Sequence, residues 1–137
     1  MCWSILYHEN KIKLNDNKID HKIYNKVNVL ENVNFNFQVD KIIIQNKLYY
    51  NITHNQCACD FFNNKKNMKL KEFFKKFIFD RMEIPCVEPY IRIKWIKNDE
   101  DFYKISSKEI KIISKNDLSK IFTDEYSEVY YKINRNE

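Results

Sequence analysis

The sequence predicts one α+β domain over residues 1–137, with an antiparallel or mixed sheet of about six strands. One main helix and one short helix are expected to pack on one face of that sheet. Three observations predict this class. Several short segments alternate apolar and polar residues, one longer segment has an apolar stripe at helical spacing, and 137 residues suffice for one core but not for a second domain.

The N-terminal half is predicted to be β-structure. Residues 2–8 form an expected first strand, and residues 22–33 alternate only in part, so their state stays open. Residues 35–44 and 48–54 are expected to pair as a hairpin around the turn at 45–47, although that turn lacks the favoured glycine.

Residues 67–83 carry the strongest helical signal of the chain. Their apolar side chains recur at i, i+3, i+4, i+7 and i+8, which gives one continuous stripe. The stripe consists of Leu70, Phe73, Phe74, Phe77, Ile78 and Met82. Asn64 or Asn67 is a candidate N-cap, and Pro85 is expected to end the helix.

The C-terminal part returns to strands. Residues 90–96 (YIRIKWI) alternate as in a half-buried strand, with Trp95 on the core face, and residues 102–113 are expected to form one bulged strand or two short ones. Ser114 opens a capping-box pattern before a short helix over 118–122. Residues 129–133 alternate as a final strand.

The chain contains no glycine, which limits both its turns and its chemistry. Backbone positions with positive φ are expected to use Asn or Asp, at residues 15–17, 63–64 and 98–99. Glycine-rich dinucleotide loops, P-loops, kinase loops and glycine-flanked nucleophile elbows are excluded. The sequence therefore argues against an enzyme of a common type. The excess of Asn, Lys and Ile indicates an AT-rich genome.

Charge and hydropathy favour a cytoplasmic protein. The formal net charge is +5, almost all of it from lysine, which permits an anionic partner. No apolar run of 18 residues and no secretory signal is present, so we expect no membrane contact. The four cysteines are then reduced thiols or metal ligands.

The segment ITHNQCACDFF contains the best candidate for a chemical site. His54, Cys57 and Cys59 could bind zinc with Cys86 as the fourth ligand, or with Cys2 in its place. Two other interpretations stay open. The cysteines could pack as small apolar side chains, which the isolated Cys-x-Cys spacing favours. Alternatively, a turn at 55–56 could bring His54 to a cysteine nucleophile, or Cys2 could act with its own amine.

Other titratable groups receive no chemical role from the sequence. His8 and His21 stand alone in polar stretches, which is typical of solvated surface. The carboxylate pairs 100–101 and 124–125 are expected in solvated turns, because acid–base catalysis needs groups that converge in a cleft.

Basic residues around the main helix and the following strand form a candidate nucleic-acid surface. Lysines next to aromatic rings suit single-stranded nucleic acid, with charge for phosphate and rings for bases. A solvated helix face explains the same lysines equally simply. The candidate residues are Lys65, Lys66, Lys69, Lys76, Arg92 and Lys94.

The sequence is most consistent with a small non-enzymatic binding protein whose partner is another protein, of the inhibitor, immunity or phage-type adaptor class. Exposed Tyr and Trp side chains are the expected anchors. The second hypothesis is a nucleic-acid-binding protein that uses its lysine and aromatic faces. The third is a zinc-stabilised or thiol-dependent protein built on His54, Cys57 and Cys59.

Overall fold

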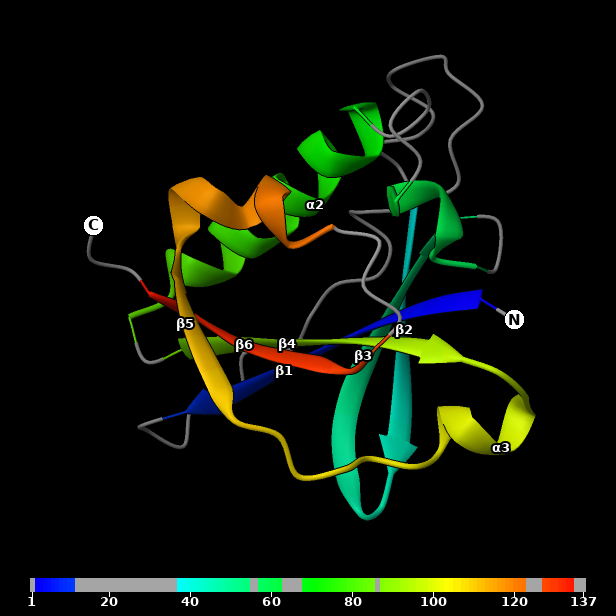
Figure 1. The fold of residues 1–137 in the computed structure, drawn as a ribbon. Helices are drawn as coiled ribbons and strands as arrows, with labels where there is room; N and C mark the ends of the chain where they lie inside the picture. Colours follow the sequence, from blue (N-terminus) through cyan, green and yellow to red (C-terminus); the bar gives the residue numbers. More distant parts are fainter. Residues whose placement is uncertain are drawn as a thin grey trace.

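The computed structural model describes residues 2–11, 37–54, 57–62, 68–85, 87–122 and 127–134. They form one six-stranded mixed sheet in the order β2-β3-β1-β4-β6-β5 (Figure 1). Its strands are β1 (Cys2–Lys11), β2 (Phe37–Ile44), β3 (Lys47–His54), β4 (Val87–Ile96), β5 (Ile110–Ser114) and β6 (Val129–Asn134). All neighbouring strands are antiparallel except β5 and β6, which are parallel. The predicted α+β class is confirmed.

One face of the sheet is covered by helix α2 (Met68–Met82) and by two 3-10 helices, η1 (Cys59–Phe62) and η2 (Lys115–Ile121) (Figure 1). The predicted stripe of α2 is buried, with Leu70, Phe74, Phe77 and Ile78 fully covered. These side chains pack with Ile5, Tyr7, Ile91 and Ile93 of the central strands in the main core. The period of the helix and the alternation of the strands thus converge on one apolar layer.

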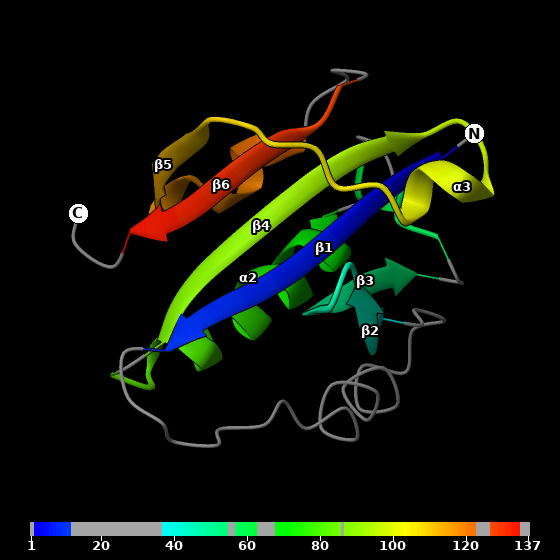
Figure 2. The same ribbon diagram turned by 90° about the horizontal axis from the view of Figure 1, so that it is seen from below.

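The opposite face of the sheet, which we call the second face, is also covered. Helix α3 (Asp99–Phe102) and the connector (residues 103–109) lie on the side away from α2 (Figure 2). A small apolar cluster of Leu6, Ile44 and Tyr49 is buried here, with Phe102 and Ile105 packed against it. Most of β4 is therefore buried, and the expectation of a half-buried strand is wrong for it.

Residues 102–109 depart from the predicted strand. Only β5, at Ile110–Ser114, is extended and paired, while Phe102 ends α3 and the connector crosses the second face. Asn98 caps α3, since its side chain accepts a hydrogen bond from the backbone N–H of Asp101 at 3.1 Å. Asn98 has extended backbone (φ −152°), so it is a helix cap and not the positive-φ turn expected there.

The predicted hairpin of β2 and β3 is confirmed, and it holds the positive-φ residues of the described chain. Gln45 has φ 52° and Asn46 has φ 65°. Two successive left-handed residues are the geometry of a two-residue type I′ turn, which matches the twist of paired strands. In a chain without glycine, a glutamine occupies one of these two positions.

The other sequence expectations divide between confirmed elements and residues outside the described ranges. The main helix, the final strand and the short helix after Ser114 are confirmed, the last as 3-10 helix η2, with the Ser114 side chain accepting from Asn116 N–H at 3.2 Å. The ambiguous segment 22–33, the turns at 15–17 and 63–64 and the Asn64 or Asn67 cap lie outside the described residues.

A buried ion pair joins the end of α2 to β1. Arg81 donates to both carboxylate oxygens of Glu9, at 2.6 and 2.7 Å, and the Tyr7 hydroxyl donates to the same carboxylate at 2.5 Å. The Arg81 and Glu9 side chains are only 7% and 6% exposed. This bidentate pair ties the last turn of α2 to β1.

Candidate metal centre

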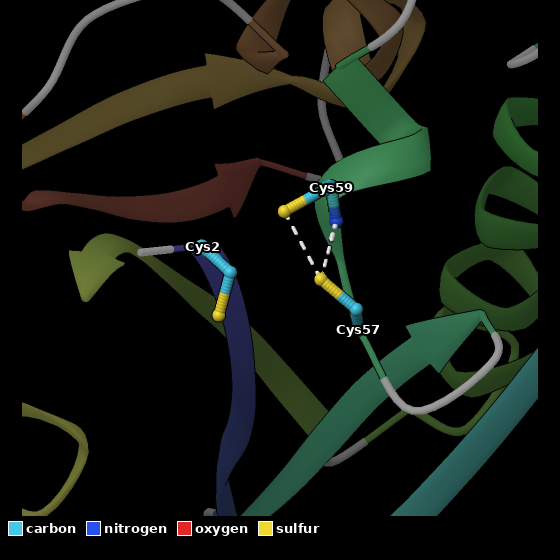
Figure 3. Close-up of side chains that lie close together, drawn as sticks. All are labelled: Cys2, Cys57 and Cys59. Carbon is cyan, nitrogen blue, oxygen red and sulfur yellow. Dashed lines mark hydrogen bonds between the residues drawn. The ribbon is translucent and has the colours of Figure 1, made fainter. Parts of the chain in front are cut away.

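Three cysteine thiols meet near the start of β1. Cys2 begins that strand, Cys57 follows β3, and Cys59 opens η1 (Figure 3). Their three Sγ atoms lie within 4.8 Å of one another, and the three side chains are half-buried. We call these residues the thiol cluster. Three cysteines this close together could hold a metal ion.

Local backbone geometry brings the thiols of Cys57 and Cys59 together. His54 and Cys57 form a bridge in which each backbone N–H donates to the other residue's carbonyl, at 2.7 and 3.2 Å. The chain therefore reverses tightly after β3. Two residues after Cys57 the chain enters η1, and the Sγ atoms of Cys57 and Cys59 lie 3.0 Å apart (Figure 3).

Two backbone amides donate to the sulfurs. The N–H of Cys59 donates to Cys57 Sγ and the N–H of Trp3 donates to Cys59 Sγ, each at 3.3 Å. A donor aimed at sulfur stabilises the thiolate more than the thiol, as it does for other anions. The second contact also connects the cluster to β1, because Trp3 stacks on Phe62 of η1 with ring centroids 4.3 Å apart.

Without a bound cation, the thiols of Cys2 and Cys59 are protonated at neutral pH. Burial, followed by the hydrogen bond with Cys57, raises the pKa of Cys59 to about 12. Burial and the neighbouring Cys57 thiol also raise the pKa of Cys2. Nucleophilic cysteines have lowered pKa values, so these directions disfavour a free thiolate nucleophile. A metal cation would reverse them, since it replaces the protons with its own charge.

His54 does not join the thiol cluster. Its Nδ1 lies 2.7 Å from Asp60 Oδ2 on η1, and its ring is buried. The turn expected at 55–56 lies outside the described residues. His54 and Cys57 exchange backbone hydrogen bonds, and the Cys57 thiol contacts the other two thiols of the cluster. Of the predicted ligand set, Cys57 and Cys59 come together with Cys2. Cys86 lies outside the described residues.

The basic residues predicted to contact nucleic acid do not form one exposed surface. Arg92 and Lys94 share the second face, but they are only 7% and 6% exposed. Arg92 donates to Glu128, and Lys94 donates to backbone carbonyls. Lys69 and Lys76 are exposed on α2 beside Glu72 and Asp80. Lys65 and Lys66 lie outside the described residues.

His8 is a buried residue that the sequence placed on the surface, and this expectation is wrong. It is 1% exposed, its Nε2 lies 2.7 Å from the Tyr130 hydroxyl, and its ring stacks on Tyr90 at 4.9 Å. Burial, and then the charges of Lys47 and Arg92, lower its pKa to about 3. The alternation of side chains along the strand could have indicated this burial, because His8 lies on the same strand face as buried Leu6.

Glu100 and Asp101 were expected in a solvated turn but lie in helix α3, where Glu100 is exposed and Asp101 is half-buried. Residues 124–125 and His21 lie outside the described ranges. Within the described ranges, none of the helices is long and apolar enough to cross a membrane.

The fold and the thiol cluster together define a small α+β domain with a candidate metal centre. Known protein families, curated proteins and solved structures contain no match to this chain.

Proposed function

We propose that this protein binds a soft metal ion, zinc in the first place, through Cys2, Cys57 and Cys59. The observation that carries the proposal is the separation of the three Sγ atoms, at most 4.8 Å. Thiolates around tetrahedral zinc lie about 3.8 Å apart, because each Zn–S bond is about 2.3 Å. Small side-chain rotations therefore suffice to close the site.

The metal would join two parts of the chain that are far apart in sequence. Cys2 belongs to the central strand β1, while Cys57 and Cys59 follow β3. A cation held by all three thiolates would tie the start of that strand to η1, so binding would also stabilise the fold. Within the described residues, no further histidine, cysteine or carboxylate belongs to the group. Cys86, the predicted fourth ligand, remains a candidate for that role.

The test is zinc affinity, measured by competition with a chromophoric chelator for the wild-type chain and for single cysteine-to-serine variants. We expect one zinc per chain, a higher melting temperature with zinc, and affinity losses greater than about 100-fold in Cys2→Ser and Cys59→Ser. Cys86→Ser tests the fourth position, and a comparable loss there would identify Cys86 as the fourth ligand. Zinc affinity that is unchanged in Cys59→Ser would contradict the proposal.

Protein binding is the second candidate function, and the edge strand β5 favours it. Among the described residues, β5 pairs only with β6, and no described strand pairs with its other edge. Ile110 and Ile112 on this strand are 44% and 67% exposed. An open edge with exposed apolar side chains can accept an extended segment of a partner as an added strand. The expected tryptophan anchors do not fit, because Trp3 is buried and Trp95 packs against the main core.

The two edges of the sheet provide a matched test of this second candidate. Ile43 on β2 and Ile112 on β5 are both 67% exposed, but they lie on opposite edge strands. We expect affinity capture from the source cell to recover a stoichiometric protein with the wild type and with Ile43→Lys, and to lose it with Ile112→Lys. Equal recovery by both variants would remove β5 as the docking edge.

A further inference from the structure

A cavity of about 420 Å³ opens on the second face, away from the thiol cluster's cysteines. Its lining comes from the end of β4, from α3, from the connector and from residues 127–128. Sites for small molecules have volumes of about 300–1,000 Å³ and combine apolar walls with a few placed polar groups. This cavity has both, since Ile105 lines it together with lysines, serines and carboxylates.

Lys94 places a buried ammonium group in the wall of this cavity. Its side chain is 7% exposed. Its Nζ donates to the carbonyl oxygens of Asp101, at 2.7 Å, and of Lys104. The nearest carboxylate oxygen, Glu128 Oε1, lies 4.0 Å away, beyond hydrogen-bonding distance. An ammonium has three donors, and the described residues accept from two of those of Lys94, which leaves one for a ligand.

The buried charges around Lys94 do not balance. Glu128 is shared, because Arg92 donates to its Oε2 while Lys94 faces its Oε1. Two buried cations thus share the carboxylate of Glu128, and a buried charge without full compensation is costly. Burial, together with the charge of Arg92, lowers the pKa of Lys94, although Glu128 and Asp101 act in the opposite direction. An added anion would supply the missing negative charge.

The mouth of the cavity is also basic. Lys97 and Lys104 belong to the lining and are exposed, so the lining has three lysines against the two carboxylates of Asp101 and Glu128. The hydroxyl groups of Ser106 and Ser127 are further polar groups of the lining. Several cations and hydroxyls around one small volume are suited to a phosphate group, which has three acceptor oxygens.

We propose that this cavity binds a small phosphomonoester, with the phosphate at Lys94, Lys97 and Lys104 and the organic body against Ile105. The volume favours an organic phosphate, because inorganic phosphate alone would leave the apolar part of the lining uncovered. The connector, whose Ser106 carbonyl accepts from Arg92 at 3.0 Å, forms one wall of the site.

Calorimetric titration with phenyl phosphate tests the proposal, at low ionic strength and about pH 7.5, where a phosphomonoester is mostly dianionic. Inorganic phosphate and benzoate serve as comparison ligands. Lys97→Gln/Lys104→Gln changes two exposed lysines of the lining. Lys69→Gln/Lys76→Gln removes the same charge from exposed lysines of α2 and is the matched control. Lys94→Met removes the buried donor, and circular dichroism checks its fold.

We expect the wild type to bind phenyl phosphate more tightly than either comparison ligand. Affinity should fall about three- to tenfold in Lys97→Gln/Lys104→Gln and stay within about twofold in the α2 control. Three results would overturn the proposal. They are no heat with phenyl phosphate at millimolar concentration, equal affinity for inorganic phosphate and phenyl phosphate, and equal losses in the two double variants. The double variants keep the test valid if Lys94→Met does not fold.

Discussion

His8 shows what a single buried side chain adds to this domain. Its ring lies among Tyr49, Tyr90 and Tyr130, and its Nδ1 has no hydrogen-bond partner among the described residues. A protonated ring would put a second charge beside Arg92 with no acceptor to receive it. The folded state therefore keeps this histidine neutral, and protonating it would lower the free energy of unfolding.

The pH dependence of folding stability should show the effect of keeping His8 neutral. The pKa of His8 is about 3 in the folded state, against 6.5 for an ordinary histidine. The unfolded chain binds the extra proton below 6.5 and the folded chain does not, so stability is complete above pH 6.5 and falls as the pH drops towards 3. The slope from this one group is at most about 1.4 kcal/mol per pH unit.

Urea unfolding at several pH values measures this slope. His8→Asn should be less stable than the wild type at neutral pH, but it should lose stability more gently between pH 6.5 and 4. His54→Asn is the comparison, because His54 lies beside the carboxylate of Asp60. Parallel pH curves for the wild type and His8→Asn would show that His8 is not the group responsible.

At the scale of elements, the β2–β3 hairpin uses a turn that its residues only partly suit. Asn46 tolerates positive φ, whereas Gln45 has a side chain that crowds the backbone there. The hairpin forms because eight cross-strand pairs, from Phe37–His54 to Ile44–Lys47, hold its register. Strand pairing and burial therefore override the local preference of the turn.

Replacing the turn residues should stabilise the protein. Gln45→Asn combined with Asn46→Gly gives the Asn-Gly pair that type I′ turns favour, and we expect a gain of about 0.5–2 kcal/mol in unfolding free energy. Chemical denaturation measures it. A loss of stability in the turn variant would show that the left-handed backbone of Gln45 and Asn46 is not a source of strain.

The cap of α3 gives a second prediction. Asn98→Gly, at a cap with extended backbone, should lower the unfolding free energy by about a few tenths of a kcal/mol, the size of a weakened N-cap.

Elements with a long periodic pattern were predictable, and those defined by distant partners were not. The stripe from Leu70 to Met82 fixes α2 without any knowledge of the sheet. Residues 102–109 have apolar side chains at strand-like spacing, yet Phe102 and Ile105 pack onto Leu6, Ile44 and Tyr49 without joining a strand. No local pattern in residues 102–109 indicates that they cover the second face. Because this covering was not predicted, His8 and Arg92 were expected on the surface.

The candidate site was predictable in the same partial way. The Cys57 and Cys59 thiols share a short segment, so their proximity follows from local spacing. Cys2 was one of two alternatives for a further ligand, and only the fold brings it to the cluster. His54 was expected among the ligands because it is close in sequence. Its ring instead points to Asp60, which lies on η1.

At the scale of the whole molecule, the two faces of the sheet differ in chemistry. The α2 face is an aromatic and aliphatic core in which Phe61, Phe74 and Phe122 contact one another. The second face combines a small apolar cluster with buried Arg92, Lys94 and His8. Apolar burial is the main source of stability, so the α2 face should carry most of it.

Two phenylalanine truncations compare the faces. Phe74 of α2 is fully buried in the main core, and Phe102 is half-buried on the second face. We expect Phe74→Ala to cost about 3–5 kcal/mol of unfolding free energy and Phe102→Ala less than about 2 kcal/mol. Equilibrium denaturation measures both values, and an unchanged denaturant slope confirms that each variant unfolds in the same transition. Equal costs would mean that the two faces contribute alike.

The strand order has a consequence for how the protein is made. β1 lies between β3 and β4, and its pairing with β4 runs from Cys2–Ile96 to Lys11–Val87. During synthesis, β1 is complete about 75 residues before its partner β4 begins. The edge of β1 that pairs with β4 stays unpaired during that interval. The centre of the sheet thus closes late, and an apolar strand stays accessible to chaperones until Val87–Ile96 arrives.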